Sequence, residues 1–150
     1  MNDVKHKPRH LFLTGPPGVG KSTLLKDVLK VLGKSISRAG FYTEEIRSND
    51  GKRTGFLTID AANTSRTEML ASAEERGEEE DKKMFVGRYR VYADSAADFV
   101  DTCFADVEPS IITKPRLMVL DEVGAMYVNS YEWVYEIFNS NFCFYKTFHH

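Results

Sequence analysis

One eight-residue segment has the most specific arrangement of reactive and glycine residues in this chain. Residues 15–22 read Gly-Pro-Pro-Gly-Val-Gly-Lys-Ser and complete the pattern G-x-x-x-x-G-K-[ST]. Glycines at these positions let the backbone turn tightly, so that its N–H groups can surround an anion. Lys21 adds a charge suited to the β- and γ-phosphates of a nucleotide, and Ser22 adds a hydroxyl suited to Mg²⁺. The segment predicts a phosphate-binding (Walker A) loop.

The residues on either side of the loop support this prediction. Residues 11–14 form a short apolar run typical of a strand, and a helical stripe follows the loop, ending at Gly33. Strand, loop and helix together place backbone N–H groups at a helix N-terminus, where an anion binds favourably. An ordinary Gly/Pro turn before a helix is the alternative. The apolar stripe comprises Leu24, Leu25, Val28, Leu29 and Leu32.

A second motif pairs an apolar run with two carboxylates. Residues 117–122 read Leu-Met-Val-Leu-Asp-Glu, which predicts a buried parallel strand with acids at its carboxyl end, where open α/β sheets bind ligands. Asp121 is then expected to hold Mg²⁺ opposite Ser22, and Glu122 to orient or deprotonate the attacking water. An ordinary strand that ends in surface acids is the alternative.

The remaining pattern predicts an α/β P-loop NTPase fold, a mostly parallel sheet with helices on both faces and an inserted antiparallel hairpin. A turn at residues 49–52 separates the two strands of this hairpin. The acidic stretch at residues 66–83 predicts a solvated loop or frayed helix. Further elements are expected as hairpin strands at residues 40–47 and 56–59, a strand at 85–92, and a helix from Asp94 or Ser95 to Phe104.

Composition narrows the class without identifying the chemistry. The 150 residues are 42% hydrophobic and 28% charged, with a net charge of −2, which argues against nucleic acid as a partner. No apolar run is long enough to span a bilayer. Cys103 and Cys143 form no metal or redox pattern and indicate a reducing compartment. We expect a cytoplasmic monomer with one nucleotide-binding domain at residues 1–150, a flexible start at 1–8 and a divergent tail at 127–150.

Several stretches of the chain resemble one family, the small P-loop nucleoside-triphosphatases typified by human cancer-related nucleoside-triphosphatase. The Gly-Phe-Tyr-Thr-Glu-Glu-Ile-Arg block at residues 40–47 is the most specific. The resemblance is also carried by the opening at residues 9–25, Gly-Lys-Arg-Thr-Gly-Phe at 51–56, Val-Gly-Arg-Tyr at 86–89 and Asp-Glu-Val-Gly at 121–124.

The resemblance implies a P-loop enzyme that hydrolyses nucleoside triphosphates (ATP, GTP, CTP and UTP) to diphosphates with low base selectivity. Together with the two motifs, it implies Mg²⁺ as cofactor, Lys21 and Glu122 as catalytic residues, and Ser22 and Asp121 as metal ligands. The implied nucleotide-binding residues are Gly15, Pro16, Pro17, Gly18, Val19, Gly20, Lys21, Ser22, Thr23, Leu117, Met118, Val119, Leu120, Asp121, Glu122, Val123 and Gly124.

The chain also departs from the family pattern. Ala125 stands where family members commonly carry a lysine, and the resemblance is expected to stop near Met126, leaving an atypical, shortened C-terminus. Reduced turnover is one expected consequence. Two other functions remain open on the sequence: nucleotide binding without turnover, and phosphoryl transfer by a nucleotide or nucleoside kinase.

Charged residues outside the two motifs offer further candidates. Arg47, Arg53 or Arg88 could steady transition-state charge as an arginine finger in cis, although a surface arginine is the simpler interpretation of each. Glu44 and Glu45 are adjacent on a predicted strand and face opposite sides, so at most one is expected to reach the site.

Overall fold

The computed structural model describes residues 10–74, 85–104, 117–121 and 144–148. Residues 1–8 and most of the predicted tail at 127–150 therefore lie outside the described residues. Two helices and eight strands are described: β1 (His10–Thr14), α1 (Lys21–Leu32), β2 (Arg38–Arg47), β3 (Arg53–Asp60), β4 (Thr67–Ala73), β5 (Phe85–Val86), β6 (Tyr89–Val91), α2 (Ala93–Phe104), β7 (Leu117–Leu120) and β8 (Phe144–Phe148).

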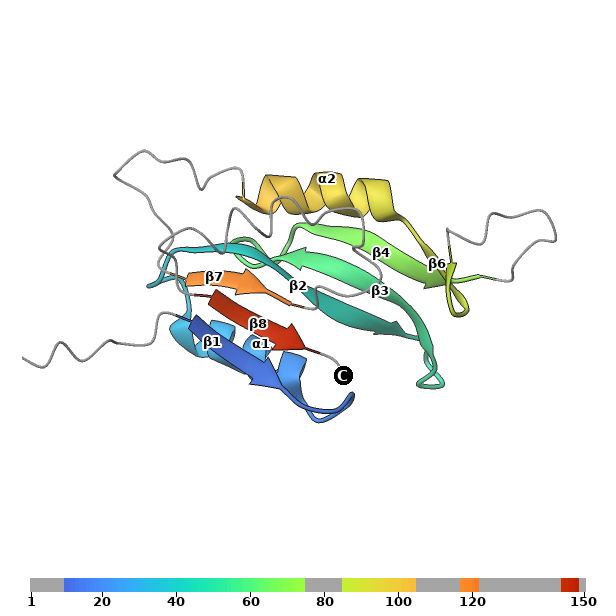
Figure 1. The fold of residues 1–150 in the computed structure, drawn as a ribbon, viewed down its shortest axis with the longest axis horizontal. Coiled ribbons are helices and arrows are strands. Elements are labelled where there is room, and N and C mark those ends of the chain that lie inside the picture. The colour runs from blue at the N-terminus through green and yellow to red at the C-terminus, as the bar shows by residue number, and fades with distance from the viewer. Residues whose placement is uncertain (1–9, 75–84, 105–116, 122–143, 149–150) are drawn as a thin grey trace, which may run out of the picture.

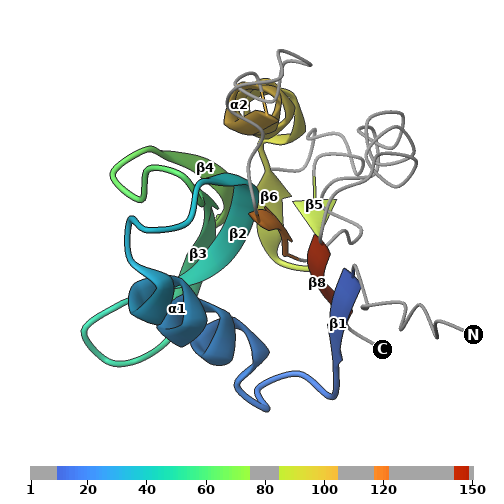
Figure 2. The same cartoon turned by 90° about the vertical axis from the view of Figure 1, so that its left-hand side faces the viewer.

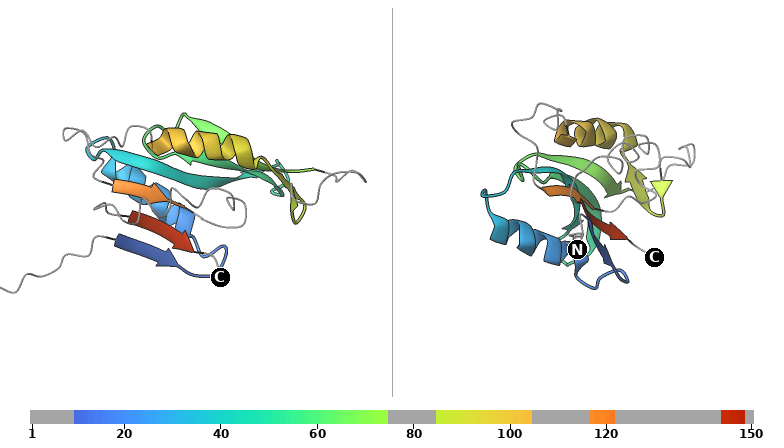
Figure 3. Two further views of the ribbon diagram at one scale, coloured as in Figure 1. Left: turned by 45° about the horizontal axis from the view of Figure 1, so that its top comes forward. Right: turned by 60° about the vertical axis from the view of Figure 1, so that its left-hand side comes forward.

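The strands form one sheet with a parallel half and an antiparallel half. Its order is β1-β8-β7-β2-β3-β4-β6-β5, and Figure 3 shows β1, β8 and β7 side by side at the parallel end. Pairings from β1 through β2 are parallel, whereas those from β2 through β5 are antiparallel. The predicted α/β class is confirmed, with an antiparallel part larger than one inserted hairpin.

Each face of the sheet carries one of the two described helices (Figures 1 and 2). Leu25 and Leu29 of α1 pack against Tyr42 and Val119, while α2 packs against Phe41 and its neighbours on the other face. Adjacent residues of a strand point to opposite faces, so β2 and β7 contribute side chains to both cores. The two helices thereby fix the central strands from both sides.

Glycine at position 40 is required by the close approach of β2 to β7. Gly40 pairs with Val119 and has φ 98°, and a Cβ at this position would lie 2.0 Å from the Val119 carbonyl oxygen. No side chain fits there without moving the backbone. Gly40 therefore sets the register that brings the end of β7 alongside the middle of β2.

Two expected elements differ from those observed. The first part of residues 66–83, predicted as a loop or frayed helix, forms β4, in which Leu70 and Ala71 are buried beneath α2. The acidic run that suggested a solvated segment falls mostly at residues 75–84, outside the described residues. The predicted strand at 85–92 is a tight hairpin of β5 and β6 that turns at Gly87, where φ is 62°.

The last described strand lies inside the sheet. β8, which the sequence analysis assigned to the divergent tail, pairs in parallel with both β1 and β7. It therefore occupies the position between the strand before the phosphate-binding loop and the strand before Asp121. Neither described helix has the length and apolar character needed to cross a bilayer.

Burial changes the protonation behaviour of two core residues. Desolvation, followed by the negative charge of Asp60, raises the pKa of the Cys103 thiol to about 12. Desolvation also raises the pKa of the Tyr42 phenol, and the Glu44 carboxylate adds to this effect. Both groups therefore keep their protons at neutral pH. For Cys103 this agrees with the sequence interpretation of a small, unreactive core residue.

Gly40→Ala tests the close approach of β2 and β7. We expect it to lower the free energy of unfolding by about 3 kcal/mol or more, because it combines a backbone clash with a positive φ. The measurement is equilibrium denaturation in urea. Gly51→Ala is the matched control, since Gly51 also has a positive φ (80°) but open space around its Cβ position, and we expect it to cost about 1–2 kcal/mol. Equal losses in the two variants would contradict this account.

Candidate functional site

The loop between β1 and α1 places backbone donors at the start of a helix. Gly18 and Gly20 have φ values of 78° and 98°, which side-chain-bearing residues rarely adopt. Gly20 is the N-cap of α1, makes no side-chain capping hydrogen bond, and is followed by a first turn without acidic residues. An anion at this point would meet the positive end of the helix and its N–H groups.

Lys21 lies across the loop that precedes it. Its Nζ donates hydrogen bonds to the carbonyl oxygens of Gly15 at 2.8 Å and Pro16 at 3.1 Å, and only 7% of the residue is exposed. The ammonium group is therefore held beside the backbone that would surround a phosphate. The contact of this ammonium group with the β- and γ-phosphates stays a prediction of the sequence motif.

Asp121 brings three chain segments together at the carboxyl end of β7. Its Oδ2 accepts hydrogen bonds from the Thr43 N–H and hydroxyl, both at 3.3 Å, and lies 3.5 Å from the Ser22 hydroxyl, which donates to it. Its backbone N–H continues the parallel ladder by donating to the Phe41 carbonyl at 3.2 Å. The residue is fully buried. Loop, β2 and β7 thus meet at a single carboxylate.

Thr43 is the functional neighbour that sequence reasoning missed. It lies on β2, buried, two residues beyond the last residue of β2 that pairs with β7. The available signal was its position in the family-specific block at residues 40–47, but only the register of β2 against β7 shows that it contacts Asp121.

A cavity of about 680 Å³ opens beside these residues. One wall comes from the loop and α1, and the other from the β2–β3 hairpin. The residues that line it are Pro17, Gly18, Gly20, Lys21, Ser22, Thr23, Lys26, Thr43, Glu44, Glu45, Arg47, Arg53 and Phe56. Its size is that of a small-molecule site, and its lining is more charged than that of an ordinary apolar pocket.

Glu44 and Glu45 both line the cavity. The expectation that at most one of them would reach it is therefore wrong. β7 pairs with β2 only along residues 38–41, and the residues of β2 that line the cavity all lie beyond this pairing, where β7 no longer covers the strand edge. A cavity at a strand edge meets side chains from both faces. Glu44 forms an ion pair with Lys26 of α1, while Glu45 pairs with Arg47 and Arg53.

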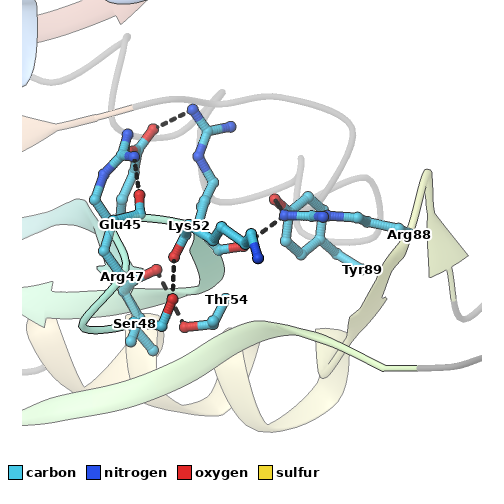
Figure 4. A network of polar contacts seen from close by, with 10 residues as sticks. Glu45, Arg47, Ser48, Lys52, Thr54, Arg88 and Tyr89 are labelled. Carbon is cyan, nitrogen blue, oxygen red and sulfur yellow. Dashed lines mark hydrogen bonds and ion pairs between the residues drawn. The ribbon is translucent and has the colours of Figure 1, made fainter.

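The three candidate arginines have different surroundings. Arg47 and Arg53 line the cavity, whereas Arg88 does not belong to its described lining. Figure 4 shows Arg88 beside Tyr89, with Arg47 and Glu45 close to each other on the hairpin. Arg88 donates to the Arg53 carbonyl at 2.6 Å and to the Tyr89 hydroxyl at 3.2 Å. Arg88 is therefore a supporting contact for the hairpin.

Arg53 has a buried donor that is not satisfied. Its Nε–H has no hydrogen-bond partner within the described part of the chain, and its guanidinium lies 5.4 Å from the centre of the Phe56 ring. A buried N–H without an acceptor costs about 1–3 kcal/mol, so such groups are uncommon and require an explanation.

The donor set suits one hard divalent cation with few protein ligands. The Ser22 hydroxyl and the Asp121 carboxylate are hard oxygen donors within 3.5 Å of each other. Mg²⁺ binds through one or two carboxylates and keeps several waters. No cluster of three or more His, Cys, Asp or Glu residues occurs in the described ranges, so a metal cage of that kind is not seen there. The residues present fit Mg²⁺.

The other predicted site residues fall into three groups. Pro17 through Thr23 line the cavity except Val19, and Gly15 and Pro16 contact the Lys21 ammonium. Met118, Val119 and Leu120 are buried in the two cores and do not line the cavity, and Leu117 packs against the α1 core. The implied nucleotide contact of these four residues stays a prediction, and the strand that they form positions Asp121. Glu122, Val123 and Gly124 lie outside the described residues.

The mixed sheet with a helix on each face, and the glycine-rich loop between β1 and α1, together define an α/β protein with a P-loop arrangement. The family profile described as NTPase matches residues 10–150, and the chain belongs to this NTPase family. The profile match extends past Met126 to residue 150, whereas the matches with individual relatives reported below cover about four fifths of the chain.

Similar proteins agree with this assignment. The chain is 38% identical over 121 residues to the cancer-related nucleoside-triphosphatase homolog of Mus musculus, covering 79% of this chain and 61% of that protein. It is 40% identical over 122 residues to nucleoside-triphosphatase THEP1 of Metallosphaera sedula, covering 81% and 59%. The solution structure of a human cancer-related nucleoside triphosphatase matches with a TM-score of 0.73 and 30% identity, over 93% of this chain and 75% of that one. The chain thus spans about three fifths of the length of these two sequence relatives.

The contact between Thr43 and Asp121 can be measured by a double-mutant cycle. We expect Thr43→Val and Asp121→Asn to show a coupling free energy of about 1 kcal/mol in urea denaturation, because each removes part of the same hydrogen-bonded pair. Val100→Ala combined with Asp121→Asn serves as control, since Val100 of α2 is also buried but its side chain cannot donate a hydrogen bond to Asp121. A coupling energy of zero for the Thr43 pair would remove it from the site.

Proposed function

We propose that this chain hydrolyses nucleoside 5′-triphosphates to diphosphate and phosphate in a Mg²⁺-dependent reaction. The observation that carries the proposal is that Lys21 and Ser22 line one cavity, with Lys21 bound to the loop carbonyls and Ser22 donating to the buried Asp121 carboxylate. Relatives named as nucleoside-triphosphatases support it. Because the chain spans about three fifths of those relatives, the activity of this chain is part of the proposal.

The phosphate groups would bind to the loop. Backbone N–H groups at the start of α1 and the Lys21 ammonium would bind the β- and γ-phosphates, since both present fixed positive charge to the anion. Ser22 and Asp121 would hold Mg²⁺, which when bound supplies positive charge to the phosphate oxygens. Thr43 would orient the Asp121 carboxylate through its two hydrogen bonds.

Glu122 is proposed to position the attacking water and accept its proton. It directly follows Asp121 in the chain, and a carboxylate at this point could reach a water beside the terminal phosphate. The proposal for Glu122 rests on the sequence pattern, since the residue lies outside the described ranges.

We further propose low base selectivity, with ATP, GTP, CTP and UTP as substrates. The residues named above all address phosphate or metal, and no stretch of the sequence resembles the guanine-reading pattern N-K-x-D. We place this activity in the cytoplasm, with support from Cys103, a free buried thiol that suits a reducing compartment. We propose a monomer, with neither nucleic acid nor membrane as partner.

Lys21→Ala tests the phosphate site directly. We expect it to weaken triphosphate binding and nearly abolish Mg²⁺-dependent phosphate release, because the loop loses its fixed positive charge. Thermal unfolding with Mg-nucleotide measures binding, since ligand at 100 times its dissociation constant adds about 2.7 kcal/mol of stability. Lys30→Ala is the matched control, because Lys30 is an exposed lysine in the last turn of the same helix.

The same assay separates the alternatives. Equal nucleotide stabilisation of the Lys21→Ala protein and the parent would place the binding site elsewhere. Binding without phosphate release would identify a nucleotide-binding protein without turnover. Release that requires an added nucleoside or nucleotide acceptor would identify a kinase, and labelled γ-phosphate would then appear on that acceptor.

Base selectivity gives an independent prediction. We expect specificity constants for ATP, GTP, CTP and UTP to lie within about two orders of magnitude, a spread of roughly 2.7 kcal/mol in transition-state stabilisation. The measurement is initial-rate phosphate release at several concentrations of each nucleotide. A preference of several thousandfold for one base would indicate a dedicated base pocket and contradict the proposal.

A further inference from the structure

We propose that Arg53 is the residue by which the cavity distinguishes nucleoside triphosphates from diphosphates, by contacting the terminal phosphate. The inference rests on the proposed function, because it takes the nucleotide to bind the loop at residues 15–22. It adds a role for the hairpin wall of the cavity, opposite that loop.

The position of Arg53 follows from the geometry of β2. Thr43 contacts Asp121, and Glu45 lies two residues farther along the same strand, a displacement of about 6.6 Å. Glu45 forms an ion pair with Arg53 on the neighbouring strand β3. The guanidinium is thereby held in the cavity that Lys21 and Ser22 also line.

The charge balance of this wall favours an anion. The Glu45 carboxylate pairs with two guanidiniums, those of Arg47 and Arg53, so one positive charge is in excess within this group. The other cavity carboxylate, Glu44, is paired with Lys26 of α1. An added phosphate oxygen would therefore meet a partly uncompensated guanidinium, in a position where charge-assisted hydrogen bonds are strong.

The hydrogen bonds of the two arginines distinguish Arg53 from Arg47. Arg47 donates to Glu45 and also to the Gly51 carbonyl at 2.8 Å, which ties it to its own hairpin. The Arg53 Nε–H has no partner within the described residues, while the side chain as a whole is 41% exposed. The guanidinium also lies over the Phe56 ring, which gives it a cation–π contact. Arg53 is therefore positioned but incompletely satisfied.

Discrimination follows because a diphosphate lacks the group that Arg53 would contact. The loop and Lys21 would bind the phosphates that both nucleotides share, so removing Arg53 should weaken the triphosphate more than the diphosphate. A second arginine with the same carboxylate partner, Arg47, is present in the same cavity and provides a control of equal charge.

The experiment is calorimetric titration of the full chain with Mg²⁺ and either ADP or the non-hydrolysable β,γ-imido analogue of ATP. We expect Arg53→Ala to lower the ratio of triphosphate to diphosphate affinity about tenfold or more. We expect Arg47→Ala to lower this ratio less than Arg53→Ala does, because it removes the excess positive charge of the group but leaves the Arg53 guanidinium in place. Arg53→Lys keeps the charge and most of the stem but loses the planar fork, and its ratio should fall between those of Arg53→Ala and the parent.

The outcomes separate this inference from the proposed function. A parent chain that binds neither nucleotide would overturn both. A parent that binds both, with an unchanged ratio in Arg53→Ala or an equal loss in Arg47→Ala, would overturn the role of Arg53 alone. Thermal unfolding of each variant without nucleotide checks that the variant is folded. If Arg53→Ala does not fold, the ratio of triphosphate to diphosphate affinity measured for Arg53→Lys decides the question.

Discussion

The parallel pairing of β2 with β7 is the constraint on which the site depends. It needs glycine at position 40, because any side chain there would collide with the Val119 carbonyl. The pairing ends at Phe41, and from that register Asp121 comes to lie beside Thr43. α1 then packs against Val119 and Tyr42 of the same two strands, which brings Ser22 to the same carboxylate. A shift of one residue in this register would turn the side chains of one strand to the wrong face.

Burial of Asp121 is tolerable because donors from β2 and the loop surround it. A buried carboxylate without partners would be strongly disfavoured, whereas hydrogen bonds to its charged form offset the loss of water. The same donors leave the carboxylate next to a cavity that contains the Lys21 ammonium. The site therefore combines a hydrogen-bonded carboxylate, proposed for Mg²⁺, with the Lys21 ammonium, proposed for phosphate. This separation of charge is what binding of a metal–phosphate complex requires.

The sequence predicted local features well and spatial neighbours poorly. The loop at residues 15–22, α1, β2, β3 and β7 follow from glycine spacing, apolar periodicity and turn residues, all of which act over a few positions. β4 was missed because it was considered together with the acidic run that follows it, and that run dominated the composition of residues 66–83. Thr43 and the joint approach of Glu44 and Glu45 depend on where β7 ends against β2. That register is set by contacts between residues far apart in the chain, and no local pattern encodes it.

The antiparallel half of the sheet explains why the cavity has a second wall. If β2 ended where its pairing with β7 ends, the chain would leave the sheet at about the level of Asp121. Instead, β2 continues to Arg47, and the chain returns as β3. This extension carries Glu45 and two guanidiniums past the carboxyl end of β7, where they line the same cavity as the loop. A phosphate-binding loop alone presents positive charge from one side. The hairpin adds two guanidiniums and one carboxylate to the same cavity, so its charged groups come from two separate parts of the fold.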